Sequence, residues 1–297
     1  MNPREAGFLL LTSRLGDPER KPLTVPQLRK LALRVRSASA EDADRELEMK
    51  DLTALGYSRE QAAQMLRLLE DRELLEYYLQ KARRAGCVPL TRAGEGYPLR
   101  LRKRLGEDSP GCLWAKGDQS LLNTPCVALV GSRELNPQNR EFARKAGICA
   151  AQQGFTLVSG NARGADKTAQ DACLKAGGSV ICVVADSLTE HPQKPNVLWL
   201  SEDGYEEEFS AQRALSRNRV IHSLGSLTLV AQASLGTGGT WNGTVRNLSS
   251  LWSDVYCFRD GSEAADQLCA MGAQRVDLED LDDLAALHQQ ALRLLID

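Results

Sequence analysis

The sequence predicts an α/β fold, a doubly wound and mostly parallel sheet preceded by a small all-helical domain. From Gly86 onward, short runs that are apolar throughout alternate with helical stretches. Strands that are buried on both faces by crossover helices have this pattern. Before Gly86 the apolar residues recur at helical spacing instead. We therefore divide the chain into a helical domain at 1–85 and a Rossmann-like domain at 86–297, which includes a short helical tail.

The helical domain is expected to contain a helix at 24–37 and a long helical run at 58–85 that is broken once, with Ser58 as its cap. The intervening segment LTALGYS, residues 52–58, is faintly similar to a helix-hairpin-helix turn. Two interpretations stay open for this domain. It is either a SAM-like or helix-hairpin-helix-like module that contacts nucleic-acid phosphates, or a helical packing module.

In the second domain the apolar runs and the stretches between them define the elements in turn. Strands are predicted at 126–130, 155–160, 179–185, 226–233 and 254–258, and helices at 140–154, 167–178, 210–225 and 242–252. A long polar connection, 186–209, precedes the helix at 210–225. The tail is expected to add a helix, a short strand at 274–278 and a final amphipathic helix.

Composition excludes several classes of protein. The chain has 297 residues and a net charge of −2, so a polyanion site would have to be a local cluster of cations. We find no apolar stretch long enough for a membrane span and no signal-peptide pattern, and we expect a cytoplasmic protein. Eight cysteines without a C-x-x-C pair and three histidines argue against a zinc site and for buried free thiols.

Loops rich in small residues follow the predicted strands, at the sheet edge where ligands bind in open α/β sheets. They span 131–139, 159–166, 186–196 and 234–241. Three of them combine glycine or serine with a route into a helix N-terminus, where unpaired N–H groups favour an anion. Arg133 and Arg163 would add bidentate donors for phosphate oxygens. Neither a G-x-G-x-x-G fingerprint nor a Walker A loop is present.

A third basic element lies in the helix predicted at 210–225. Arg213 and Arg217 share a helical face, and Arg217, Asn218 and Arg219 form a dense cluster. The alternative is that the acidic stretch 202–209 absorbs these arginines in ion pairs. We find no catalytic constellation, so the sequence predicts a protein that is not an enzyme.

The segments VALVGSR, LVSGNARGADKTAQDACLKAGG, RNRVIHSLG and GAQRV resemble, in order and spacing, the DNA-processing protein A (DprA/Smf) family. The resemblance covers roughly residues 85–280. It implies an extended Rossmann fold that binds single-stranded DNA without turnover or cofactor. It further implies a homodimer that protects DNA in natural transformation or recombination and helps to load a RecA-type recombinase. Gln170 stands where the family has a histidine.

Carried over residue by residue, the resemblance implies DNA or phosphate contacts from the three basic elements and from one further lysine. These residues are Gly131, Ser132, Arg133, Ser159, Gly160, Arg163, Gly164, Lys194, Arg217, Asn218 and Arg219. Trp199, Tyr205 and Trp241 are candidates for stacking on bases, and the alternative for each is a place in the core or at its rim. Binding is expected to weaken with salt and to show no sequence preference, because backbone contacts carry little base information.

A second class of function competes with DNA binding. The segment GTGGTW is distantly similar to the phosphate loop of phosphoribohydrolases, so the alternative is a Rossmann-like nucleotide sensor or nucleotide hydrolase. Gln232 stands where a hydrolase would need a carboxylate. Ligand size separates the two classes, since a DNA binder prefers oligomers and a sensor or hydrolase saturates with the mononucleotide.

Overall fold

The computed structural model describes residues 1–37 and 47–287, which contain a nine-stranded sheet of order β1-β2-β6-β5-β4-β3-β7-β8-β9. The strands are β1 (Cys87–Thr91), β2 (Cys112–Gly117), β3 (Cys126–Val130), β4 (Thr156–Ser159), β5 (Ser179–Val184), β6 (Val197–Ser201), β7 (Leu227–Val230), β8 (Asp254–Phe258) and β9 (Gln274–Val276). From β6 to β9 all neighbours pair in parallel, and β2 pairs antiparallel with both β1 and β6. The predicted α/β class with a mostly parallel sheet is confirmed.

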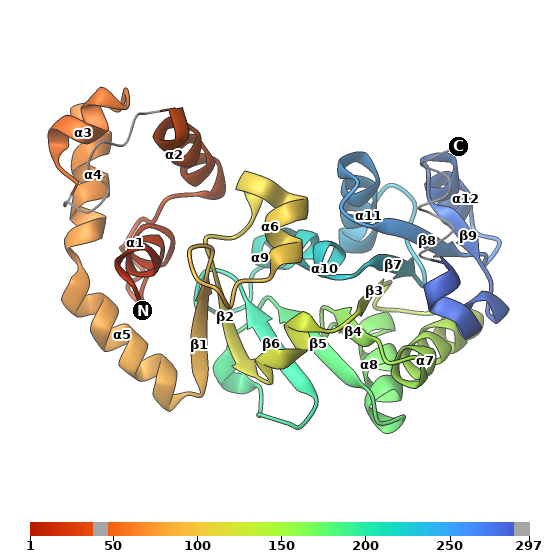
Figure 1. Cartoon of the computed structure of the whole chain (residues 1–297). Coiled ribbons are helices and arrows are strands. Elements are labelled where there is room, and N and C mark those ends of the chain that lie inside the picture. The colour runs from red at the N-terminus through yellow and green to blue at the C-terminus, as the bar shows by residue number, and fades with distance from the viewer. Residues whose placement is uncertain (38–46, 288–297) are drawn as a thin grey trace.

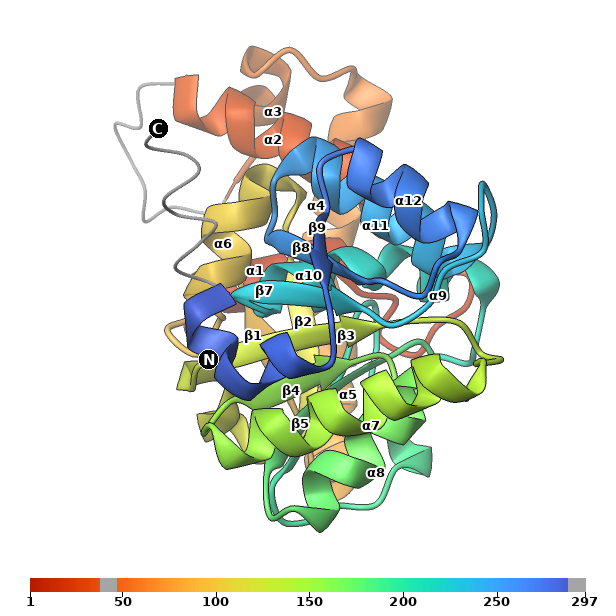
Figure 2. The ribbon, with the colours of Figure 1, turned by 90° about the vertical axis from the view of Figure 1, so that its right-hand side faces the viewer.

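Helices cover both faces of the sheet (Figures 1 and 2). They are α6 (Leu99–Leu105), α7 (Pro137–Gln152), α8 (Ala165–Lys175), α9 (Ala211–Ser216), α10 (Asn218–Leu224), α11 (Gly238–Ser250) and α12 (Glu263–Ala270). One apolar cluster joins the sheet to α7 and α8, and a second joins the opposite face to α6, α10, α11 and α12. Burial on both faces explains why the central strands are apolar throughout.

In the described residues before the sheet, 1–37 and 47–86, the helices are α1 (Pro3–Thr12), α2 (Val25–Ser37), α3 (Met49–Ala54), α4 (Arg59–Glu70) and α5 (Arg72–Arg84). Ser58 caps α4, as predicted, because its hydroxyl accepts the N–H of Gln61, and the helical run breaks at Asp71. Part of this region has its own apolar cluster. In contrast, Tyr78 of α5 packs against Trp114 and Tyr205 of the sheet domain. The boundary at 85/86 therefore stays a proposal.

The polar connection 186–209 departs from the sequence prediction, since it contains the buried strand β6. The helix expected at 210–225 is two helices that meet at Arg217. The prediction of a final amphipathic helix includes residues 288–297, which lie outside the described residues. Seven of the eight cysteines are buried and all eight are free, as predicted for thiols. No helix in residues 1–37 and 47–287 is long and apolar enough to cross a bilayer.

Candidate functional site

A cleft of about 970 Å³ opens at the carboxyl ends of β3, β4 and β7. We call it the main cleft. It is lined by the loop after β3, the start of α8, the junction of α9 with α10, and the loop that leads into α11. A smaller hollow of about 310 Å³, the side pocket, adjoins it beyond the ends of β4 and β5. Arg133, Phe209 and Arg217 line both. Three of the four predicted loops meet at the main cleft, and the fourth contributes Asp186 to the side pocket.

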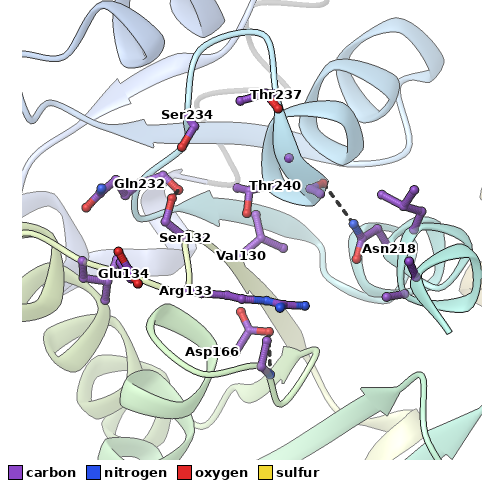
Figure 3. A pocket seen from close by; sticks show the side chains of 18 of the residues that line it. Val130, Ser132, Arg133, Glu134, Asp166, Asn218, Gln232, Ser234, Thr237 and Thr240 are labelled. Atoms are coloured by element: carbon purple, nitrogen blue, oxygen red, sulfur yellow. Dashed lines mark hydrogen bonds between the residues drawn. The ribbon is translucent and has the colours of Figure 1, made fainter. Parts of the chain in front are cut away.

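The loop after β3 is held by hydrogen bonds to the end of β7. The N–H and hydroxyl of Ser132 both donate to the carbonyl of Gln232, over 2.9 and 3.2 Å. The side-chain oxygen of Gln232 accepts the N–H of Asn136 over 3.0 Å, just before α7 begins. Gln232, which replaces the carboxylate expected of a hydrolase, thus fixes this loop. Gly131 and Arg133 also line the cleft, and the side chain of Arg133 extends into it (Figure 3).

The loop after β4 is organised by the buried carboxylate of Asp166, which accepts the N–H groups of Gly160 and Ala162 over 3.1 and 3.2 Å. Burial raises the pKa of Asp166, and the charge of Arg217 opposes that rise. Gly164, with a φ of +89°, has no space for a side chain, since a Cβ would lie 2.4 Å from the carbonyl oxygens of Ser132 and Arg133. Asp166 thus orients backbone, as a carboxylate at a helix N-terminus does.

Two predicted residues of this second loop differ in their exposure. Ser159 is buried, and its hydroxyl accepts a hydrogen bond from Gln170 over 2.5 Å. Gln170, at the position where the resemblance implies a histidine, therefore makes an internal hydrogen bond to Ser159. Arg163 lies at the rim, with its side chain 76% exposed and 3.3 Å from Glu134. Arg163 is free to reach a ligand, and Ser159 supports the loop.

The three arginines that the sequence placed in one cluster have three different environments. Arg213 pairs with the carboxylate of Asp203 over 3.4 Å and donates to the backbone carbonyl of Glu207. Arg219 is buried and pairs with the buried carboxylate of Glu202 over 2.7 Å. The acidic stretch thus absorbs two of the arginines, as the alternative interpretation held, and Arg219 is left out of the interface that we propose.

Arg217 remains available to a ligand. Its guanidinium lies against Gly160, so close that a Cβ there would be 1.5 Å from Nη1, and this close approach requires glycine. The Nε of Arg217 is buried and has no hydrogen-bond partner in the described part of the chain. Burial lowers the pKa of Arg217, and the charges of Asp166 and Asp186 partly offset that effect. A buried donor without a partner is energetically costly, and the rest of this partly exposed side chain borders both hollows.

The start of α11 lines the main cleft together with Arg217. Asn218 donates to the carbonyl of Gly239 over 3.0 Å and ties α10 to this helix (Figure 3). Thr237, the N-cap, makes no side-chain capping bond, and residues 237–240 line the cleft. The N–H groups of a first helical turn lack partners within the helix and favour an anion.

The aromatic residues differ in their exposure. Trp199, Tyr205 and Trp241 are at most 8% exposed, so the structure places these three stacking candidates in the core, as the alternative held. Phe209 is 58% exposed and lines both the main cleft and the side pocket. Sequence reasoning missed Phe209, although its position between an acidic run and the cap of α9 is a usable signal. Lys194 is exposed, lines neither hollow, and lies three residues before β6 begins.

His222 lies beneath the main cleft and is 1% exposed. Its Nδ1 is 3.2 Å from both Thr228 Oγ1 and Asn247 Nδ2. Burial and the charge of Arg217 lower the pKa of His222 to about 3.

We expect His222 to make the fold sensitive to acid. Below a pH of about 6.5 the unfolded chain takes up a proton on this histidine, whereas the folded chain does not. The free energy of unfolding should therefore fall by about 1.4 kcal/mol per pH unit from this group as the pH drops from about 6.5 to 5. Urea unfolding across that range should show a flatter dependence in His222→Gln. An unchanged slope would contradict this assignment.

Comparisons with known proteins agree with the architecture. DNA processing protein DprA of Streptococcus pneumoniae is 34% identical over 141 residues, which are 44% of this chain and 50% of that protein. The chain thus matches about half the length of its curated relatives. The X-ray structure of the Streptococcus pneumoniae protein has a TM-score of 0.72 at 26% identity and covers 96% of this chain and 98% of that one. DNA processing protein A of Helicobacter pylori has a TM-score of 0.54 at 24% identity, over 70% of this chain and 96% of that one, and shares the fold.

The model of one protein family matches residues 89–287, which include every strand from β2 to β9 and all the loops of the main cleft. The segments that resembled DprA/Smf proteins lie within this match. On that match, the chain belongs to the DNA recombination-mediator protein A family.

Proposed function

We propose that this protein binds single-stranded DNA in the main cleft, with the phosphates of the strand near Arg217, Arg133 and the start of α11. The observation that carries the proposal is the position of Arg217, which lines both the main cleft and the side pocket with its guanidinium against Gly160. A guanidinium at this place can donate to the phosphate oxygens of a bound strand. Membership of a family of DNA recombination mediators supports the choice of ligand.

Exposed aromatic surface favours a single strand over a duplex. Phe209 is more than half exposed where the main cleft meets the side pocket. The unstacked bases of a single strand can stack on such a ring, whereas those of a duplex are already stacked. The Helicobacter pylori protein is described as having a single-stranded DNA binding mode. The similarity of that protein to this chain shows a shared fold. The proposed ligand therefore depends on the residues that line the main cleft.

Partners and biological role are proposed from the family. We propose that the protein protects single-stranded DNA, acts as a homodimer, assists a RecA-type recombinase and has no catalytic turnover. The side chains that shape the main cleft support a role in binding. Gln232 and Asp166 are both engaged with backbone N–H groups that hold the loops in place.

Fluorescence anisotropy with a labelled oligo-dT of about 35 nucleotides tests the proposal. The affinity should fall steeply as salt rises, because binding releases counterions from the strand. In Arg133→Ala/Arg163→Ala the slope of log affinity against log salt should decrease by roughly 1.4, at about 0.7 for each phosphate that an arginine no longer neutralises. Arg144→Ala/Arg246→Ala removes the same charge outside the residues that line the two hollows, and should keep the wild-type slope.

Competition identifies the class of ligand. AMP should fail to displace the oligomer at concentrations comparable with that of the protein. Efficient displacement by AMP, or no binding of the strand at all, would contradict DNA binding and favour the nucleotide sensor or hydrolase.

A further inference from the structure

We propose that the side pocket is a subsite for a single nucleobase and that Asp186 makes it prefer guanine. This inference rests on the proposed binding of single-stranded DNA. It adds a base preference at one position to a site that otherwise holds the backbone. Three features carry it: the position of the Asp186 carboxylate, the walls of the pocket, and the pattern of donors on the bases.

Asp186 follows β5 and is fixed by an aromatic pair behind it. Its Oδ1 is 2.8 Å from Nε2 of His191. The His191 ring is stacked on Trp199 with centroids 4.2 Å apart and an interplanar angle of 14°. The Trp199 indole N–H donates to the carbonyl of Pro192 over 3.1 Å. The carboxylate therefore has a defined position. The side chain of Asp186 is still 36% exposed, and Asp186 is one of the residues that line the side pocket.

The environment of Asp186 also favours its negatively charged form. Partial burial acts to raise its pKa, but the hydrogen bond and charge of His191 bring that pKa below its ordinary value. Asp186 is therefore ionised at neutral pH and can only accept hydrogen bonds. Arg133, Arg163 and Arg217 line the same pocket and offset the negative charge. Asp186 can thus face a base while the arginines hold the adjoining phosphates.

The dimensions of the side pocket suit one base. Its volume is about 310 Å³, at the lower end of the range for small-molecule sites and too small for a length of strand. Val184, Ala185 and Ala214 provide apolar wall, and Phe209 provides an aromatic surface at its edge. Base recognition in single strands combines a stacking surface with hydrogen bonds to the Watson–Crick edge.

Guanine fits an acceptor-only carboxylate better than the other bases do. Its Watson–Crick edge presents two adjacent donors, N1–H and the N2 amino group, which match the two oxygens of a carboxylate. Each oxygen has two lone pairs, so Oδ1 can accept from guanine as well as from His191. Adenine and cytosine offer one amino group beside an acceptor. Thymine presents N3–H between two carbonyl oxygens, which the carboxylate repels. Hydrogen bonds to a charged group contribute about 1.5–3 kcal/mol each, enough to distinguish these edges.

Three oligonucleotides of equal length test the inference by anisotropy: oligo-dT, the same strand with isolated guanines, and the same strand with inosines, which lack the N2 amino group. The wild-type protein should bind the guanine strand about tenfold more tightly than oligo-dT, with the inosine strand between them. Asp186→Asn should lose this discrimination. Glu190→Gln, an equal change of charge at an exposed residue of the same loop, should keep it.

Each other outcome has a distinct meaning. Equal affinity of the wild-type protein for the three strands would overturn the guanine subsite and leave DNA binding intact. A guanine preference that survives in Asp186→Asn would overturn the role of the carboxylate. Failure of every strand to bind would overturn the proposed function itself.

Discussion

Replacing Arg217 by alanine should weaken single-stranded DNA binding by about tenfold to a hundredfold, the loss expected when charge-assisted hydrogen bonds to a phosphate are removed. The guanidinium lies over Gly160 between the main cleft and the side pocket. Its buried Nε has no partner among the described residues. A phosphate in either hollow should accept charge-assisted hydrogen bonds from this guanidinium.

The same substitution should change the free energy of unfolding by no more than about 1–2 kcal/mol. Alanine removes a buried donor that the folded protein leaves unsatisfied, and that removal is favourable. Asp166 keeps both of its backbone N–H donors, which limits the cost of losing the nearby positive charge.

Anisotropy with oligo-dT and urea unfolding should be measured on the same preparations. Arg246→Ala is the matched control, because it removes an exposed arginine of α11 outside the residues that line the two hollows. Wild-type affinity in Arg217→Ala would place the strand elsewhere on the protein. A loss of affinity accompanied by a large loss of stability would assign Arg217 a structural role.

The central strands of the fold could be predicted because burial on both faces leaves them apolar throughout. The runs at 126–130 and 254–258 match β3 and β8 residue for residue. β6 was missed because its five residues lie between a polar connection and an acidic stretch. No predicted helix precedes it in the sequence, so the alternation of strand and helix that identified the other strands is absent there. The assignment of β6 depends on its pairing with two neighbours, β5 and β2, and those pairings are tertiary contacts.

The loops of the site were easier to predict from the sequence than the contacts and exposure of its side chains. Glycine and serine after a strand identify loops that can approach a ligand. Small residues permit the tight turn from strand to helix, and that turn lies at the sheet edge where ligands bind. Arg213, Arg217 and Arg219 have similar positions in the sequence, yet only the folded protein brings Glu202 to one of them and backbone carbonyls to another. Exposure of Phe209 and burial of Trp241 likewise depend on packing between distant segments.

Replacing Glu202 by glutamine should destabilise the fold by about 3 kcal/mol or more. The carboxylate of Glu202 pairs with both Nη atoms of Arg219, over 3.2 and 2.7 Å, with both residues 7% exposed. Glutamine keeps the size of the side chain but leaves the guanidinium buried without a counter-charge. Breaking a buried pair in this way typically costs about 3–5 kcal/mol.

Urea unfolding at neutral pH measures the effect, with Glu141→Gln as the control. Glu141 pairs with Arg144 on the surface of α7, and an exposed pair of this kind contributes less than about 1 kcal/mol. The double variant Glu202→Met/Arg219→Met should recover much of the lost stability, because apolar side chains of similar length can replace a buried ion pair. If Glu202→Gln were as stable as the wild type, the pair would not be holding α10 against the end of β6. Arg219 would then return to consideration as a ligand for DNA, because a guanidinium that tolerates the loss of its carboxylate is free to take a phosphate in its place.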